Sequence, residues 1–291
     1  MVNNIEWFTK KDGDKVQINS RTIYRDLSTE LVNKLDNNLS INEIISWIKN
    51  TTREAFKENY SRYPEVGALN NAAGRWNEFI ATTLLSEIAI DMNQKADECI
   101  AVFSLPDSRL QTEGSDEVSS KFLSLFSKDE FDTGKALAKI TPFKNNIFLP
   151  SPDYVIVVFA KGDIATSIQS LLAQQAKTPD TLALYNFLKG KIQVGELKAA
   201  VSLKTSNRSD RRYQPLFEAA MIKAMGHLLD QQWKYYMVAS TLTPADQSIF
   251  SKAISPHSMA LEENAKLVDG TYLYNRKSNL EPLVQAAIKN A

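Results

Sequence analysis

The stretch from Val201 to Glu218, VSLKTSNRSDRRYQPLFE, constrains the fold of this chain more than any other. Its first residues are the end of a predicted strand, in which side chains alternate with a period of two. A cluster of cations that contains one acid follows. The stretch then enters a helix at Pro215, a residue that suits the first helical turn. A strand that leads into a helix in this way is typical of a sheet covered by helices. Lys204 and Glu218 are the candidate chemical groups of this segment.

Composition sets broad limits on the class of protein. A length of 291 residues predicts one large domain or two modest ones, and 43% hydrophobic residues are enough for a real core. The 34 basic residues balance 34 acidic ones, which argues against a generic polycation but not against a local basic groove. Residues 189–212 hold seven cations and two anions, a local excess of +5. A charge cluster is often only a solvated face, but here it coincides with the candidate chemistry.

Three features bear on the compartment. Cys99 is the only cysteine, so an intrachain disulfide and a cysteine zinc site are excluded. The N-terminal residues lack the apolar stretch of a signal peptide. The longest apolar run, Tyr154 to Ala160, is too short to span a bilayer. We therefore expect a soluble intracellular protein with no membrane partner.

The first third of the chain is predicted to be helical. Residues 1–25 show no clean period and are expected to form an irregular arm. Ser40 and Glu43 form a capping box, and isoleucines at helical spacing predict a helix over 41–59. A loop containing proline and glycine follows, and a second amphipathic helix is expected over 75–93. Residues 1–95 are predicted to be a helical N-terminal region that packs on the remainder.

The remainder, 96–291, is predicted to be an α/β core with a mixed central sheet flanked by helices. The expected strands are 99–104, 154–160, 192–205, 234–240 and 271–275. Residues 107–118 are expected to be a loop. The expected helices are one or two within 119–141, one over 164–189 broken near Pro179, one over 215–229, one over 244–254 and a final helix. In the helix that begins at Pro215, the residues predicted to face inward are Leu216, Ala220, Met221, Ala224 and Leu228.

Two adjacent strands that carry Pro-Asp and then acid-x-Lys have the chemistry to cut a phosphodiester. Carboxylates with open water sites suit magnesium, which lowers the pKa of bound water and stabilises charge on phosphate oxygens. A lysine beside them can steer or deprotonate the water, or neutralise the phosphate. Pro152-Asp153 supplies the first element. The pattern is widespread, and taken alone it has a high false-positive rate.

The acid-x-Lys pattern occurs twice, as Glu196-Leu197-Lys198 and, with serine in place of the acid, as Ser202-Leu203-Lys204. Both lie on one face of the predicted strand, and six residues separate them by roughly 20 Å. Only one of them can therefore share a metal site with Asp153. The serine version needs a carboxylate from elsewhere, and Glu218 is available.

Arg208, Asp210 and Arg211 form a fork of donors with one acceptor. Arginine can bond guanine O6 and N7 in a bidentate pair, and an acid can accept from cytosine N4. Two arginines and one aspartate per subunit match two G·C pairs, and a symmetric dimer doubles these to four. The alternative is a salt cluster at a helix N-terminus. The cations expected to touch phosphates are Lys198, Arg212 and Lys191.

These residues carry a family resemblance. Pro152-Asp153, Lys204, Arg208 to Arg211 and Glu218 resemble the CCGG-recognising type II restriction endonucleases, the NgoMIV and SgrAI relatives of the PD-(D/E)XK superfamily. In that family the second acid has moved from the strand to the following helix. The segment from Gly74 to Phe79 resembles the family's helix that places an additional glutamate near the metal, which here would be Glu78; a solvated first-turn acid is the alternative. The resemblance is specific over about 150–218 and faint elsewhere.

The resemblance implies magnesium-dependent cleavage of double-stranded DNA before the first C of CCGG, leaving 5′ overhangs, in a prokaryotic cytoplasm. Asp153 and Glu218 would bind Mg²⁺, Lys204 would act at the water and phosphate, Glu78 would assist, and Ser202 would occupy the usual position of the acid. A palindromic site implies a homodimer, with a tetramer left open. Glu196 is then expected to be a strand-edge salt pair or a phosphate contact.

Two other functions remain open from the sequence: a repair or mobile-element nuclease with little sequence preference, and a DNA-binding protein without catalysis. His227 lies among apolar neighbours in a predicted helix, and His257 lies in a loop flanked by proline. Neither has a partner at metal-binding spacing in the sequence, so we expect both histidines to be structural.

Overall fold

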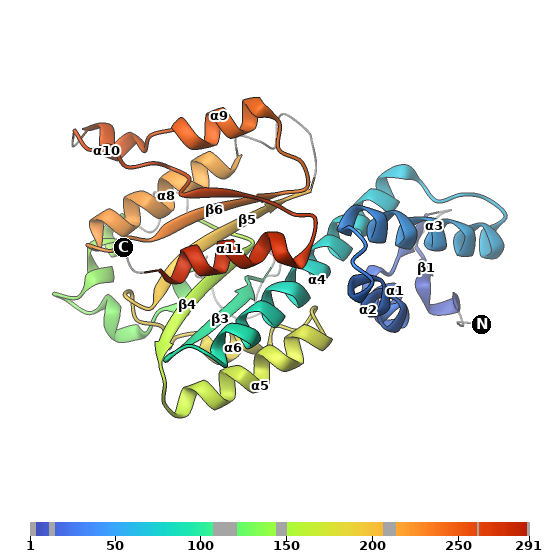
Figure 1. Ribbon diagram of the computed structural model, residues 1–291, viewed down its shortest axis with the longest axis horizontal. Coiled ribbons are helices and arrows are strands. Elements are labelled where there is room, and N and C mark those ends of the chain that lie inside the picture. Colours follow the sequence, from blue (N-terminus) through green and yellow to red (C-terminus); the bar gives the residue numbers. More distant parts are fainter. Residues whose placement is uncertain are drawn as a thin grey trace. The chain divides into compact units, whose positions relative to one another are not determined.

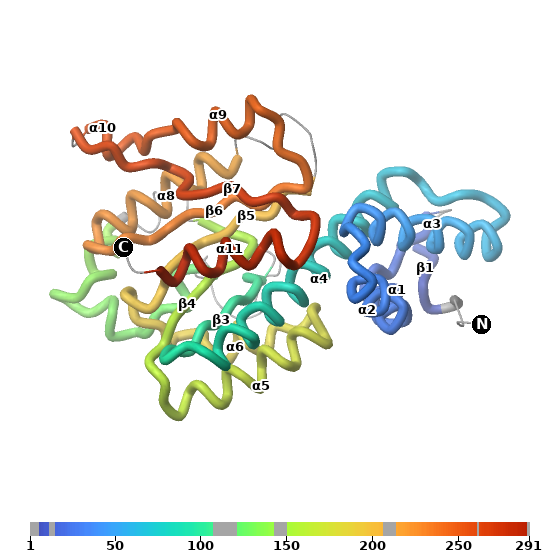
Figure 2. Tube along the Cα trace, in the orientation of Figure 1, coloured from blue at the N-terminus to red at the C-terminus, as the bar shows by residue number. Residues whose placement is uncertain are grey.

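The computed structural model describes residues 4–11, 15–106, 121–143, 150–205, 214–260 and 262–289 (Figures 1 and 2). The chain divides into two compact units. One comprises Met1–Thr83 with Thr178–Asp180, and the other comprises Leu84–Lys177 with Thr181–Ala291. The division falls inside a long helix, after Thr83, whereas the sequence predicts a boundary near 95.

The first unit contains a small hairpin and a group of helices. Its elements are η1 (Asn4–Trp7), β1 (Phe8–Lys10), β2 (Val16–Ile18), α1 (Ser20–Asp26), α2 (Ser28–Asp36), α3 (Ile41–Tyr60) and the first part of α4 (Val66–Asn93). The predicted irregular arm is wrong for the described residues within 1–25, because β1 and β2 pair in antiparallel register and α1 follows them. Strands of three residues are too short to show a period. Contacts of Phe8 with the rings of Phe56 and Tyr60 hold the hairpin on α3.

The predicted start of α3 is confirmed, and that of α4 is wrong. The Ser40 hydroxyl accepts from the Glu43 N–H, and the Glu43 carboxylate accepts from the Ser40 N–H, which completes the capping box. Helix α4 begins at Val66, within the predicted loop, and includes Gly67 and Gly74. A glycine inside a helix costs about 1 kcal/mol relative to alanine. Burial of three apolar side chains in the same segment offsets this cost: Leu69, Ala72 and Ala73.

The second unit is built on a five-stranded mixed sheet, as the sequence predicts. Its strands are β3 (Glu98–Ser104), β4 (Tyr154–Ala160), β5 (Leu197–Lys204), β6 (Lys234–Ala239) and β7 (Gly270–Leu273). They follow one another across the sheet in chain order. Strand β4 is antiparallel to both of its neighbours, β3 and β5, and β5, β6 and β7 are parallel to one another. The strand β4 is almost wholly buried, as its continuous run of apolar residues predicts.

Helices cover this sheet. They are α5 (Asp163–Lys177), α6 (Ala183–Leu188), α8 (Gln214–Leu228), α9 (Pro244–Lys252), α10 (Pro256–Ala260) and α11 (Lys277–Ile288). Helix α11 lies across β4, β5 and β7 (Figure 1), α8 lies against β6, and α5 lies against β3. The predicted break near Pro179 is confirmed.

The helices predicted within 119–141 are wrong for the described part of that range. It holds four short 3-10 turns instead: η2 (Leu123–Leu125), η3 (Lys128–Phe131), η4 (Ala136–Lys139) and η5 (Thr141–Phe143), the last of which extends just beyond it. Phe122 and Phe126 pack on Trp233, so long-range aromatic contacts set this conformation. The loop predicted over 107–118 lies outside the described residues.

Candidate active site

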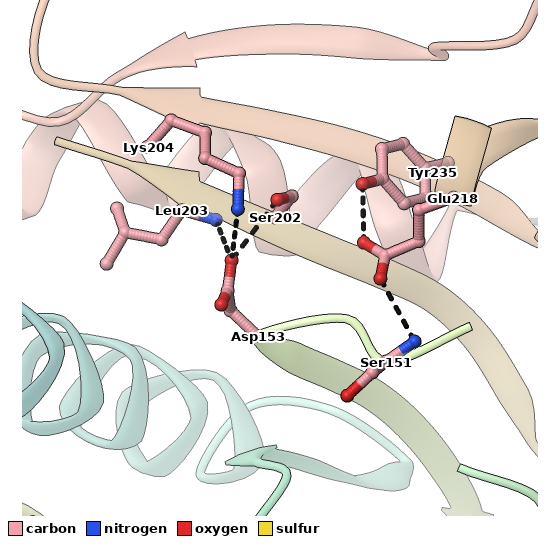
Figure 3. Close-up of polar contacts among 7 residues, drawn as sticks. All are labelled: Ser151, Asp153, Ser202, Leu203, Lys204, Glu218 and Tyr235. Atoms are coloured by element: carbon pink, nitrogen blue, oxygen red, sulfur yellow. Dashed lines mark hydrogen bonds and ion pairs between the residues drawn. The ribbon is translucent and has the colours of Figure 1, made fainter. Parts of the chain in front are cut away.

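Asp153, which directly precedes β4, meets three donors at the end of β5 (Figure 3). Its Oδ2 accepts from the Leu203 N–H at 2.6 Å and from the Ser202 hydroxyl at 3.1 Å. The Lys204 ammonium lies 3.5 Å from the same oxygen. The Asp153 and Lys204 side chains keep 35% and 26% of their surface exposed, so both remain accessible to a ligand.

The strand register explains this meeting. β4 and β5 are antiparallel, with Tyr154 opposite Val201. One step further along this register places Asp153 opposite Ser202. Because side chains alternate between the faces of a strand, Ser202 and Lys204 share one face and Leu203 offers its backbone N–H. The predicted association of Pro-Asp with the second acid-x-Lys position is therefore present in the geometry.

Glu218 approaches from α8 and is held by two hydrogen bonds (Figure 3). Its Oε1 accepts from the Ser151 N–H at 3.0 Å, and its Oε2 accepts from the Tyr235 hydroxyl at 2.7 Å. Burial raises the pKa of the Glu218 carboxyl, and the negative charge of Asp153 raises it further. The Tyr235 hydroxyl, Lys204 and the Ser151 N–H act in the opposite direction. Glu218 thus belongs to the same electrostatic cluster as Asp153 and Lys204.

The face of α8 that turns inward differs from the predicted one. Leu228 is 39% exposed, and Leu216, Ala220, Met221 and Ala224 are only half-buried. The residues that are buried are Pro215, Ala219, Ile222, Met225 and Gly226. The helix is apolar around most of its circumference, so periodicity does not select one face.

Glu196-Leu197-Lys198 lies at the other end of β5. Strand β5 begins at Leu197, so Glu196 lies in the preceding turn rather than in the predicted strand. Its carboxylate accepts from the Gln193 N–H at 2.7 Å, and its carbonyl accepts from the Val158 N–H at 2.9 Å. Val158 is five residues along β4 from Asp153. The structure therefore does not bring Glu196 to the Asp153 cluster.

The predicted phosphate contacts Lys191 and Lys198 lie towards this same end. The Lys198 ammonium donates to the Gly195 carbonyl at 2.8 Å. The Lys191 ammonium lies over the Phe187 ring, 3.9 Å from its centroid. Base contacts were predicted for Arg208, Asp210 and Arg211, and a phosphate contact for Arg212. These four residues lie outside the described residues.

Glu78 belongs to the first unit, on α4. Its carboxylate pairs with the Arg75 guanidinium at 2.9 Å, and both side chains are nearly half exposed. Its predicted role near the metal stays a prediction.

Tyr235 and Ser151 are site residues that the sequence analysis missed. Tyr235 lies on β6, and burial together with the nearby Glu218 charge raises its pKa well above the usual value for tyrosine, so it is a neutral donor. Alternation within KYYMVAS indicates only that one of the two tyrosines faces each side of the sheet. The pairing of β6 beside β5 is a long-range contact that no local pattern encodes.

The carboxylates fit a hard divalent cation. Asp153 and Glu218 present only oxygen ligands, and the Asp153 charge adds to the cost of ionising the partly buried Glu218 carboxyl, a cost that a cation would reduce. Within the described ranges, no group of three histidine, cysteine, aspartate or glutamate side chains is arranged to hold a metal. A site built from these two residues would leave positions for water and phosphate oxygens, as magnesium sites do.

Comparison with solved structures places the fold among the restriction endonucleases. A crystal structure of the type IIF restriction endonuclease Bse634I with cognate DNA matches with a TM-score of 0.73 and 18% identity, covering 97% of each chain. A second structure of Bse634I restriction endonuclease matches with a TM-score of 0.74, at the same identity and coverage. The predicted fold class is confirmed.

The family model of the Cfr10I/Bse634I restriction endonucleases matches residues 2–290, and the chain belongs to this family of site-specific deoxyribonucleases. The type II restriction enzyme Cfr10I of Citrobacter freundii is 24% identical over 206 residues, which cover 66% of this chain and 68% of that enzyme.

The predicted type II restriction endonuclease is therefore confirmed, and the subgroup is corrected from the NgoMIV and SgrAI relatives to the Cfr10I/Bse634I family. The motifs used for the prediction, a strand lysine and a helix acid, do not distinguish these subgroups. None of the helices in the described part of the chain is long and apolar enough to cross a membrane.

Proposed function

We propose that this protein is a magnesium-dependent restriction endonuclease that cuts double-stranded DNA at a palindrome with a CCGG core, before the first C, leaving 5′ overhangs. The observation that carries the proposal is the meeting of Asp153, Lys204 and Glu218, from three separate elements, at one end of β4 and β5. A carboxylate pair can hold a metal that activates water, and a lysine beside it can stabilise the charge that develops on the phosphate.

Each residue of this set has a distinct task. Asp153 and Glu218 would hold Mg²⁺, which when bound supplies a more acidic water and neutralises charge on phosphate oxygens. Lys204, half-buried and held by Asp153, places a positive charge where the attacked phosphate would lie. Ser202 and the Leu203 N–H orient Asp153 by donating to Oδ2. Tyr235 and the Ser151 N–H orient Glu218 in the same manner.

Base recognition is assigned to Arg208, Asp210 and Arg211, on the chain between Lys204 and Glu218. Arg208→Ala or Arg211→Ala loses about 1–3 kcal/mol of discrimination for each bidentate contact to guanine. Weak binding to arbitrary duplex persists, because phosphate contacts supply it. Lys191, Lys198 and Arg212 are proposed to make such contacts, so Lys191→Ala weakens binding to all duplexes alike.

The assembly and compartment follow from the palindrome and the family. Two copies related by a two-fold axis would each recognise one half-site, so we propose a homodimer, or a dimer of dimers, in a prokaryotic cytoplasm. Residues 1–95 are proposed to pack on the core and to bring Glu78 to the site. Sedimentation of the protein with and without a CCGG duplex measures the number of chains.

Digestion of a plasmid of known sequence tests the central proposal. We expect discrete fragments in Mg²⁺, none in EDTA, and fragment ends that sequence to a cut before CCGG. The matched control is Glu218→Gln. This variant is expected to bind the CCGG duplex in Ca²⁺ and to leave the plasmid uncut in Mg²⁺. A smear would indicate the less specific nuclease, and discrete fragments whose ends lie elsewhere would reject the CCGG core. Intact plasmid would reject cleavage by this chain.

A further inference from the structure

The only two histidines of the chain lie in contact. His227, near the end of α8, and His257, in α10, are thirty residues apart in sequence, and their ring centroids are 5.4 Å apart with an interplanar angle of 40°. The sequence shows no partner at metal-binding spacing for either histidine and predicts that both are structural. Both residues belong to the same unit, and His227 is exposed while His257 is half-buried, so an ion can reach the pair from solvent.

We propose that His227 and His257 form a two-imidazole site for a transition metal ion of the zinc class, separate from the magnesium carboxylates. Imidazole nitrogen suits Zn²⁺, Ni²⁺ and Cu²⁺, whereas Mg²⁺ prefers oxygen ligands. Zinc–nitrogen bonds of about 2.0–2.1 Å place the centroids of two imidazoles on one tetrahedral ion roughly 5 Å apart. The observed separation of the two ring centroids, 5.4 Å, is close to this value.

The hydrogen bond of His257 assigns its ligand atom. The Ser255 hydroxyl is hydrogen-bonded to His257 Nδ1, and Ser255 is fully buried. This contact leaves Nε2 as the nitrogen available to the ion. A histidine that binds a metal usually has its other nitrogen held by a polar partner, which fixes the tautomer and the ring orientation. Ser255 would be a positioning residue of this kind.

The surrounding charges are compatible with a cation. Glu263 is the acidic side chain whose charge acts on His257, and Lys223 is the basic one. The Lys223 ammonium is held by the Asp269 carboxylate at 2.6 Å, which reduces its repulsion of an ion. Water would complete the coordination.

Occupancy of this site would tie α8 to α10. Helix α8 also carries Glu218, nine residues before His227, so the ion would stabilise the element that positions an active-site carboxylate. Anything that binds only the folded state raises the midpoint of unfolding. This gives the site a measurable consequence that does not depend on nuclease activity.

The test uses untagged full-length protein in saturating Mg²⁺, which fills the carboxylate site but does not compete for imidazole. Zinc titration by calorimetry is expected to show one ion per chain, and zinc is expected to raise the Tm. His227→Gln and His257→Gln each abolish both effects, and Ser255→Ala weakens affinity by about tenfold. The buried Cys99 thiol does not compete.

The matched control is Gln247→Ala, an exposed change on the neighbouring helix α9 that is expected to keep both effects. Because His227 is exposed, His227→Gln is expected to fold normally, and its Tm without zinc checks this. Absence of saturable zinc binding by the wild type would overturn the proposal. Zinc binding by either histidine variant that equals the binding by the wild type would overturn it as well.

Discussion

At one end of β5, Glu196-Leu197-Lys198 closes a turn, whereas at the other end Ser202-Leu203-Lys204 surrounds the Asp153 carboxylate. The spacing of the lysine is the same in both segments. The two segments differ in their neighbour across the sheet. The Glu196 carbonyl pairs with the N–H of Val158, in the buried part of β4, whereas Ser202 faces Asp153. The complete acid-x-Lys motif is thus the one without a second carboxylate from β4.

The comparison shows how a second carboxylate can come from outside the strand. Ser202 occupies the position of the usual acid and donates to Asp153 instead of carrying charge. Glu218 enters from α8 and is held between the Ser151 N–H and the Tyr235 hydroxyl. A charged group needs only to reach the same corner of the sheet, and the element that carries it can change.

Single replacements of Glu218 and of Glu196 by glutamine give the largest expected contrast in cleavage. Glu218→Gln removes a proposed metal ligand, so we expect plasmid cleavage to fall below detection while binding to a CCGG duplex in Ca²⁺ is retained. Glu196→Gln at the other end of β5 retains cleavage, because its carboxylate contacts a local turn. An inactive, folded Glu196→Gln beside an active Glu218→Gln would reverse the assignment of the two ends.

The two lysines give the next contrast. Lys204→Ala removes the positive charge beside Asp153, and loss of one such preorganised group costs about 10²–10³-fold in rate. Lys198→Ala is expected to keep the single-turnover rate at saturating enzyme, since its ammonium contacts the Gly195 carbonyl. Equal rate losses in both variants would show that position along β5 does not matter.

Tyr235→Phe tests whether the orientation of Glu218 matters. The change removes the hydroxyl that donates to Oε2 and leaves the ring in place. Partners of this kind contribute about 10–100-fold to metal affinity or activity. We expect a higher magnesium concentration for half-maximal cleavage, with DNA binding unchanged. A wild-type magnesium dependence would mean that the Ser151 N–H alone holds Glu218.

The smallest expected effect concerns stability without a divalent ion. Burial and Asp153 disfavour the charged form of Glu218, so Glu218→Gln relieves a penalty and is expected to match or raise the Tm. Its amide can still accept from the Ser151 N–H and donate to the Tyr235 hydroxyl. Burial raises the pKa of Glu196 as well, so Glu196→Gln relieves a penalty while it weakens a local hydrogen bond worth about 0.5–1.5 kcal/mol, and its Tm is expected to stay close to that of the wild type. Thermal unfolding in EDTA measures both, and a Tm for Glu218→Gln below that for Glu196→Gln would contradict this account.

Local sequence determined much of the secondary structure. The run of valine and isoleucine in β4, the proline at the start of α8 and the Ser40 capping box are short-range signals, and the structure has the expected element at each place. Pro152-Asp153 and Lys204 were recognisable for the same reason, since their elements could be assigned and two adjacent strands bring their ends together.

Only the tertiary structure decided which face of α8 turns inward, because an almost uniformly apolar helix gives no periodic signal. The same holds for the aromatic contacts that replace helices with 3-10 turns before β4, and for the Tyr235 hydroxyl on Glu218. It holds also for the contact between His227 and His257. Each of these depends on residues far apart in the chain, and their proximity is set by packing of the whole core rather than by local propensity.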